Sequence, residues 1–153
     1  MNDLELLYAS IESKGRAAIQ SGNEFIDENL NHMEQDHRLA LTLLISLRGP
    51  IVNKLRLLEQ EIRAVEPQQY YYPDADMHVT LIELICSTPT FTRDEAVIQQ
   101  GVEIIEEAIR NLEPFDIAFN GIIASNGAIL ARGYYQDGVL ALRESVRKVA
   151  KQR

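Results

Sequence analysis

The sequence predicts an α+β fold in which mixed sheets are flanked by helices. Short apolar runs of strand length alternate with longer stretches in which apolar residues recur every three or four positions. Short links separate these segments, and the predicted order is α, β, α, β, β, α, β, β, α. With 153 residues, of which 46% are apolar and 25% charged, the chain is expected to form a single compact domain.

A long amphipathic helix is predicted from Asn2 to about Leu30. Apolar and small residues recur along it at spacings of three and four, namely Leu4, Tyr8, Ile11, Gly15, Ala18, Gly22, Phe25 and Ile26. The two glycines of this stripe each cost about 1 kcal/mol relative to alanine, so a neighbouring element is expected to approach the helix backbone closely. A role of this helix in dimer formation is the alternative to packing on its own core.

A polar connector follows, so residues 1–38 are predicted as an N-terminal helix with its connector, ahead of a main domain at 39–153. The connector contains His32 and His37, with two acidic residues between them. Their spacing matches no recognised set of metal ligands. Solvated linker side chains are therefore expected, and neither a metal nor another cofactor is predicted.

Four segments are predicted in the first half of the main domain. A strand from Leu39 to Leu47 ends at a Gly-Pro turn, and a helix from Ile51 to Val65 follows. A brief strand at Gln69–Tyr72 and a longer one at Met77–Cys86 come next. Cys86, the one cysteine, directly follows an apolar run and is expected to be a buried, unreactive thiol.

The second half begins with a helix from Asp94 to Leu112, preceded by a capping-box pattern of Thr92 and Glu95. Two apolar runs at 115–124 and 128–135 then flank an Asn-Gly pair, which predicts a hairpin. A last helix is predicted at 138–151. The expected buried residues of the two helices are Val97, Ile98, Val102, Ile105 and Ile109, and Val139, Leu142, Val146 and Val149.

Charge and hydropathy exclude several classes of partner. The net charge of -8 argues against binding of a long nucleic acid, which requires a clustered basic surface. No apolar run approaches the roughly 20 residues needed to cross a bilayer, and the start of the chain is acidic rather than basic. No membrane association is therefore predicted. A cytoplasmic location is expected, in agreement with the single cysteine.

The strand at Met77–Cys86 carries the residues best suited to chemistry. Alternation along a strand places His78 and Thr80 on the same face, roughly 6 to 7 Å apart. A histidine can give or take a proton around neutral pH, and a threonine hydroxyl can donate a hydrogen bond to an oxyanion. Together they suit a phosphoryl group. The alternative is a structural histidine that is buried and hydrogen-bonded.

The run Tyr70-Tyr71-Tyr72-Pro73-Asp74-Ala75-Asp76-Met77-His78-Val79-Thr80-Leu81 resembles the first motif of the two-histidine phosphoesterase superfamily, which includes 2′-5′ RNA ligase-like and cyclic phosphodiesterase proteins. The order of predicted elements from Leu39 onward is also similar to that family. The resemblance implies two lobes that each contribute one His-x-Thr or His-x-Ser strand to a shared groove, without an obligatory metal. It implies an acid/base role for His78 and a phosphate-binding role for Thr80.

The implied ligand is a small phosphate ester, with a cyclic phosphodiester, a 2′-5′ linkage or a short RNA end as candidates. The sequence contains one His-x-Thr, whereas the family's second motif is expected after the last predicted helix. An incomplete C-terminal lobe is therefore expected, in a truncated or naturally shortened chain. Loss of one of two proton-transfer groups typically costs about 10² to 10⁴ in rate, so weak or no activity is expected of this chain alone.

Two alternatives stay open beside this hypothesis. A homodimer would complete the groove by supplying His78 from each chain. A non-catalytic binding or assembly module belongs to a different class of protein. Further groove residues are Tyr72 and Tyr135, which suit stacking on a base or ribose, and Arg132, which suits a phosphate. The alternatives for these three are core or edge aromatics and a solvated strand charge.

Overall fold

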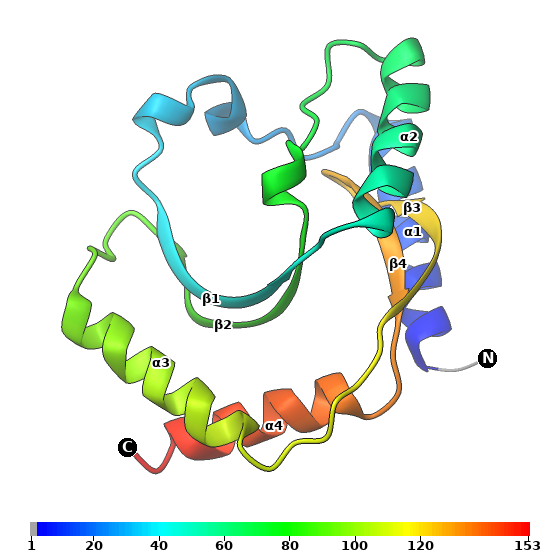
Figure 1. Ribbon diagram of the computed structural model, residues 1–153. Coiled ribbons are helices and arrows are strands. Elements are labelled where there is room, and N and C mark those ends of the chain that lie inside the picture. Colours follow the sequence, from blue (N-terminus) through cyan, green and yellow to red (C-terminus); the bar gives the residue numbers. More distant parts are fainter. Residues whose placement is uncertain (1–2) are drawn as a thin grey trace. The chain divides into compact units, whose positions relative to one another are not determined.

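The computed structural model describes residues 3–153, and of Asn31 only the backbone. It confirms the α+β class: the described residues form four α-helices, three short 3-10 helices and two antiparallel two-stranded sheets (Figure 1). The elements are α1 Asp3–Ser21, η1 Glu28–Asn31, η2 Met33–Gln35, β1 Leu39–Ser46, α2 Pro50–Val65, η3 Asp74–Asp76, β2 His78–Thr88, α3 Glu95–Ile109, β3 Ala118–Ala124, β4 Ile129–Tyr134 and α4 Gly138–Ala150. The expected mixed sheets are not present among these residues.

The chain divides into two compact units. The terminal unit comprises Met1–Gln35 and Ala108–Arg153, and it contains α1, β3, β4 and α4. The central unit, Asp36–Glu107, contains β1, α2, β2 and nearly all of α3. The predicted division at residues 38 and 39 stays a prediction.

The first helix is shorter than predicted. α1 ends at Ser21, and the predicted first residue, Asn2, lies outside the described residues. Gly22 has a positive φ of 67°, the Gly22 N–H donates to the Ile19 carbonyl at 3.2 Å, and the Asn23 N–H donates to the Ala18 carbonyl at 2.9 Å. This pair of bonds is the Schellman pattern, in which glycine in a left-handed conformation ends a helix.

The predicted close approach to α1 is confirmed at Gly15 but is wrong at Gly22. Gly15 is buried, and a side chain there would overlap the carbonyl oxygen of Ala124 in β3. No atom lies within 4 Å of the corresponding position at Gly22. Of the two glycines, one therefore allows packing of α1 on β3, and the other allows the chain to leave the helix.

The terminal unit has its core on α4. Val139, Leu142, Val146 and Val149 are buried as predicted, together with Ile123 of β3. The predicted hairpin is also confirmed, with the Ser125 N–H donating to the Ala128 carbonyl at 2.8 Å across the turn. The Phe25 N–H donates to the Asn126 carbonyl at 2.8 Å, which ties the segment after α1 to this turn.

The central unit is built on the antiparallel pair β1 and β2. Its buried apolar residues are Val52, Met77, Leu81 and Ile104. Gly101 of α3 lies against the side chains of Leu41 and Leu84, so α3 covers part of this sheet. The predicted strand at 69–72 is wrong, since these residues are irregular and no strand among residues 3–153 pairs with them.

Three side-chain predictions for the central unit need correction. Asp94, rather than Thr92, caps α3, because its carboxylate accepts hydrogen bonds from the N–H groups of Ala96 at 2.8 Å and Val97 at 3.4 Å. Val102 is exposed, whereas Ile104 is buried, so the inward face of α3 is rotated from the predicted one. Cys86 is exposed, because the sheet has two strands in the described part of the chain and both its faces are only partly covered.

None of the helices found between residues 3 and 153 has both the length and the apolar character required to cross a bilayer.

Candidate functional site

The predicted pair His78 and Thr80 lies at the start of β2. Both side chains are exposed and point to the same face, since strand residues two apart share a face. The predicted strand is confirmed, with its first residue at His78. The alternative of a buried structural histidine is wrong, because His78, the first residue of β2, is exposed.

One hydrogen bond sets the orientation of the His78 ring. Nδ1 lies 2.6 Å from the carbonyl oxygen of Asp76. A carbonyl oxygen only accepts hydrogen bonds, so Nδ1 carries the proton and donates it. In the neutral ring, Nε2 therefore has a free lone pair on an exposed side chain. This is the arrangement required of a general base or of an acceptor facing a ligand.

Ser46 is a site residue that the sequence analysis missed. It is the register partner of His78 across the β1–β2 pair, and it is exposed. Directly opposed residues of an antiparallel pair project to the same face with Cβ atoms about 4.5 to 5.5 Å apart. The Ser46 hydroxyl therefore shares a face with His78 and Thr80. The only sequence signal was its place at the end of a predicted strand, which does not identify the opposite residue.

Tyr72, a predicted site residue, lies beside His78. The two ring centroids are 6.4 Å apart with an interplanar angle of 76°, an edge-to-face contact. Tyr70 lies against Tyr72 in the same way, at 5.4 Å and 76°. Tyr70 was not among the predicted site residues, although it belongs to the same run of three tyrosines as Tyr72.

The segment that carries these tyrosines is attached to α2. The Tyr71 hydroxyl donates to the Glu66 carbonyl at 2.7 Å, and the Arg63 guanidinium lies 4.1 Å from the Tyr71 ring centroid. Arg56 forms an ion pair with Asp74, at the start of η3. These contacts take the place of strand pairing, and they hold the chain on both sides of Tyr72.

The other two predicted groove residues, Arg132 and Tyr135, belong to the terminal unit. The Arg132 Nε donates to the Asn120 carbonyl at 3.0 Å, and its guanidinium lies 5.9 Å from the Tyr134 ring centroid. Tyr135 is half-buried just after β4. His78, Thr80 and Tyr72 are in the central unit, so a groove shared by all five residues stays a prediction.

No group of three or more potential metal ligands occurs between residues 3 and 153. In the connector, His32 Nδ1 lies 3.7 Å from a Glu34 carboxylate oxygen, and both side chains are exposed. His37 is exposed as well.

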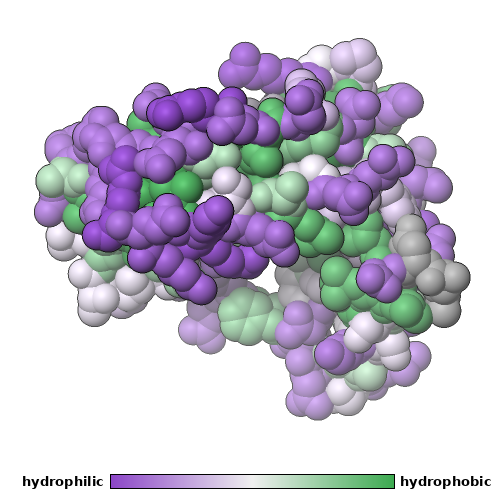
Figure 2. All heavy atoms as spheres, turned by 90° about the horizontal axis from the view of Figure 1, so that it is seen from below, coloured by the Kyte–Doolittle hydropathy of each residue, from purple (hydrophilic) through white to green (hydrophobic). Residues whose placement is uncertain are grey.

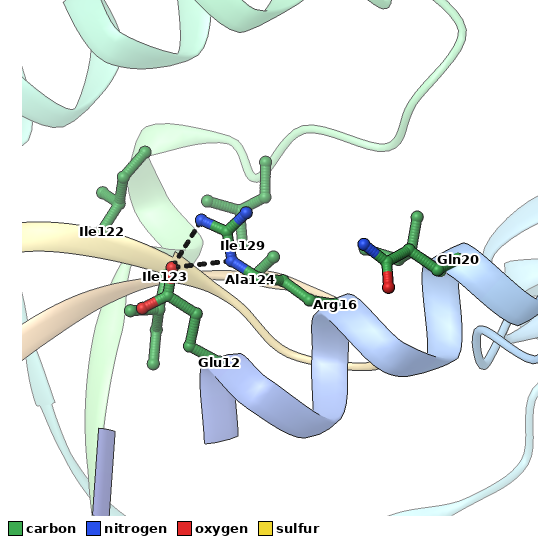
Figure 3. A pocket seen from close by; sticks show the side chains of 8 residues that line it. Glu12, Arg16, Gln20, Ile122, Ile123, Ala124 and Ile129 are labelled. Atoms are coloured by element: carbon green, nitrogen blue, oxygen red, sulfur yellow. Dashed lines mark hydrogen bonds and ion pairs between the residues drawn. The ribbon is translucent and has the colours of Figure 1, made fainter. Parts of the chain in front are cut away.

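A groove of about 390 Å³ lies in the terminal unit between α1 and the β3–β4 hairpin (Figure 3). Ile19, Ile122 and Ile129 supply its apolar lining. Glu12 and Arg16 at its side form an ion pair with each other at 2.8 Å, so their charges are already compensated. Figure 2 shows that hydrophobic residues also reach the surface among hydrophilic ones elsewhere on the molecule.

Comparisons with protein-family models, curated proteins and solved structures found no match to this chain. The resemblance to two-histidine phosphoesterases therefore rests on the residues around His78 and on the order of elements.

Proposed function

We propose that this protein binds a small phosphate ester at His78 and acts on it in the manner of two-histidine phosphoesterases. A cyclic phosphodiester or a 2′-5′ linkage is the proposed target. The observation that carries the proposal is the exposed His78 ring, which is oriented through Nδ1 by the Asp76 carbonyl and shares its face with two hydroxyls. A buried or freely rotating imidazole would not be prepared for proton transfer in this way.

Each group has a defined role in the hydrolysis of a cyclic phosphodiester. Water attacks phosphorus as His78 Nε2 accepts its proton, one P–O bond of the ring breaks, and a proton reaches the leaving oxygen. The Thr80 and Ser46 hydroxyls donate hydrogen bonds to the phosphoryl oxygens, whose charge increases in the transition state. The chemistry proposed for these residues requires no metal or cofactor.

One histidine supplies one of the two proton transfers. We propose slow turnover for the chain alone, with water as the opposite acid, since a positioned second group is typically worth about 10² to 10⁴ in rate. The proposal includes a two-lobed architecture, a cytoplasmic location, and short RNA ends rather than long nucleic acids as the largest ligands. In an alternative form of this proposal, a homodimer supplies both proton-transfer groups, with one His78 from each chain.

The central test is an assay of the purified chain against 2′,3′-cyclic nucleotides. His78→Ala is expected to lower kcat by about 10² or more, because the proton acceptor is lost. Ser46→Ala and Thr80→Ala are each expected to lower kcat/KM by about 10-fold, which is the typical effect of losing one hydrogen bond to a charged group. His37→Ala, in the exposed connector, is the matched control. Turnover that is the same in His78→Ala and His37→Ala would end the catalytic proposal.

The same variants distinguish a non-catalytic binding module. In that case the cyclic nucleotide binds to the chain, the Ser46 and Thr80 variants weaken binding, and no product accumulates with any variant. The exposed hydroxyls favour this second function, since they suit phosphate binding whether or not a proton is transferred.

A further inference from the structure

We propose that Arg56 is a positioning residue for His78, which acts through the turn η3 and keeps the proton of the neutral imidazole on Nδ1. The inference rests on the proposed function, because it explains how the proton acceptor of that reaction is held. It assigns Arg56 no contact with the phosphate ester. Its effect on His78 passes through Asp74 and the backbone of the turn.

The guanidinium of Arg56 contacts both oxygens of the Asp74 carboxylate. Nε donates to Oδ1 at 3.1 Å, and Nη2 pairs with Oδ2. A planar guanidinium that meets a carboxylate at two points fixes the orientation of the carboxylate as well as its distance. Arg56 lies one helical turn after the buried Val52 of α2, and it is 18 positions away from Asp74 in the sequence. A helix that is anchored in the core therefore holds the start of η3.

The turn η3 is short, and its other end is fixed to β1. The Asp76 N–H donates to the Pro73 carbonyl at 2.9 Å. The Met77 N–H donates to the Asp74 carbonyl at 3.4 Å. A single 3-10 turn has poor hydrogen-bond geometry, so it needs support from outside. Met77 is buried, and its carbonyl accepts a hydrogen bond from the Leu47 N–H at 2.9 Å. The Asp76 carbonyl thus lies between two fixed points, the Asp74 side chain and Met77.

The position of the Asp76 carbonyl decides which nitrogen of His78 accepts a proton. The carbonyl oxygen lies 2.6 Å from Nδ1, so Nδ1 carries the proton and Nε2 has the lone pair. The neutral imidazole of a free histidine in water prefers the opposite tautomer, with the proton on Nε2. A turn that moved the carbonyl away would therefore convert Nε2 from an acceptor into a donor. The Arg56–Asp74 pair supports the tautomer that the proposed proton transfer requires.

The Arg56–Asp74 pair is exposed, which allows its role in positioning to be separated from overall stability. The two side chains are 46% and 47% exposed. Exposed ion pairs contribute little to the stability of a fold. Loss of this pair is therefore expected to release the turn while the fold is retained. Arg93 and Glu95 form another exposed pair in the central unit, with Nε 3.1 Å from a carboxylate oxygen, and Arg93→Gln is the matched control.

NMR of the ring nitrogens in the isotope-labelled full chain tests the inference directly. At about pH 8.5 the imidazole of an ordinary histidine is neutral, and its two nitrogen shifts report which nitrogen carries the proton. His78→Gln identifies the His78 signals among those of the three histidines. Wild type is expected to carry the proton mainly on Nδ1. Arg56→Gln and Asp74→Asn are each expected to make the Nε2–H tautomer the major form. Arg93→Gln is expected to keep the wild-type ratio.

Turnover of 2′,3′-cyclic nucleotides gives a second measurement. Arg56→Gln is expected to lower kcat by about 5- to 10-fold with little change in KM, because fewer His78 rings can accept a proton while no contact with the substrate is lost. Arg56→Lys is expected to recover part of kcat and part of the Nδ1–H tautomer, since lysine keeps the charge without the planar fork. Arg93→Gln is expected to leave kcat unchanged.

The outcomes separate this inference from the proposed function. If the His78 tautomer is the same in Arg56→Gln, Asp74→Asn and Arg93→Gln, the positioning role is overturned, and the proposed function is decided by the turnover of His78→Ala. A wild-type ring with its proton on Nε2 also overturns the positioning role. If the tautomer changes in the Arg56 and Asp74 variants but His78→Ala turns over like wild type, the positioning role stands and the proposed function fails. Circular dichroism of each variant shows whether the fold is retained, and Arg56→Lys serves as the test if Arg56→Gln unfolds.

Discussion

At the scale of single residues, backbone carbonyls and register partners decide how each polar side chain is presented. The Asp76 carbonyl orients His78, and the pairing of Ser46 with His78 adds a second hydroxyl to the face of Thr80. Both contacts are formed by backbone groups and strand pairing rather than directly by a second polar side chain. A polar face of this kind can therefore form at the end of a two-stranded sheet without a buried polar network.

The connector gives a pH-dependent prediction at this scale. The side-chain hydrogen bond from Arg38, followed by that from its backbone N–H, lowers the pKa of the Asp36 carboxyl from 3.8 to about 2. A lowered pKa in the folded state means that the pair stabilises the connector above pH 3.8 and loses this contribution as the pH falls through about 2. NMR titration of the Asp36 carboxyl should show its midpoint near 2.

Two variants of Arg38 separate the effect of its charge from that of its geometry. Arg38→Gln removes the charge and is expected to raise the Asp36 midpoint toward its ordinary value. Arg38→Lys is the control and is expected to raise the midpoint less, since lysine keeps the charge without the planar fork. A wild-type midpoint at the ordinary carboxyl value would show that the contact does not form in solution.

At the scale of elements, helix boundaries depend on where glycine is placed and what lies beside it. α1 contains Gly15 against the Ala124 carbonyl and is followed by Gly22 with a φ of 67°. One residue type thus serves close packing at one position and chain reversal at the other. A glycine also precedes α2: Gly49 has a φ of 67°, and Pro50 follows it at the first helical position.

The two glycines of the first helix lead to different predictions for the free energy of unfolding. Gly22→Ala is expected to lower it by about 1 kcal/mol, because alanine must adopt the left-handed conformation, although no neighbouring element would contact its side chain. Gly15→Ala is expected to lower it by about 1 to 3 kcal/mol, because α1 must move away from β3. Urea denaturation measures both.

Ser13→Ala is the matched control, since Ser13 is an exposed residue of the same helix and its substitution should change the unfolding free energy by less than about 0.5 kcal/mol. A Gly15→Ala variant as stable as the Ser13→Ala variant would contradict the close packing of α1 on β3.

At the scale of the whole molecule, each unit has its own small buried core while many large apolar side chains remain exposed. Val65, Ile26 and Leu57 are 78%, 69% and 62% exposed. Exposed apolar surface favours association when it forms a continuous patch. In the proposed function, the assembly state therefore decides whether a second His78 can reach the phosphate ester.

The homodimer version of the proposed function makes a quantitative prediction. Light scattering should give about twice the 17.3 kDa of one chain, and specific activity should rise with chain concentration until the dimer is saturated. Mixing inactive His78→Ala chains with wild type should then lower activity more than dilution alone. A monomeric mass with constant specific activity would contradict the homodimer version. The proton donor to the leaving oxygen would then be water rather than a second histidine.

By itself, the sequence determined the features that depend on local periodicity and turn chemistry. These are the α+β class, the inward positions Val139, Leu142, Val146 and Val149 of α4, the Asn-Gly hairpin, and the shared face of His78 and Thr80. Each follows from spacings of two, three or four residues, or from a short turn, and these hold wherever the element lies in the fold.

Only the tertiary structure decided the features that depend on residues far apart in the chain. It paired Ser46 with His78, replaced the predicted strand at 69–72 by an attachment of Tyr71 to α2, and left Cys86 exposed. Strand register and surface coverage depend on which segments contact each other. A single sequence does not show which segments pair. The local pattern therefore specified His78, Thr80 and Tyr72, while long-range pairing added Ser46.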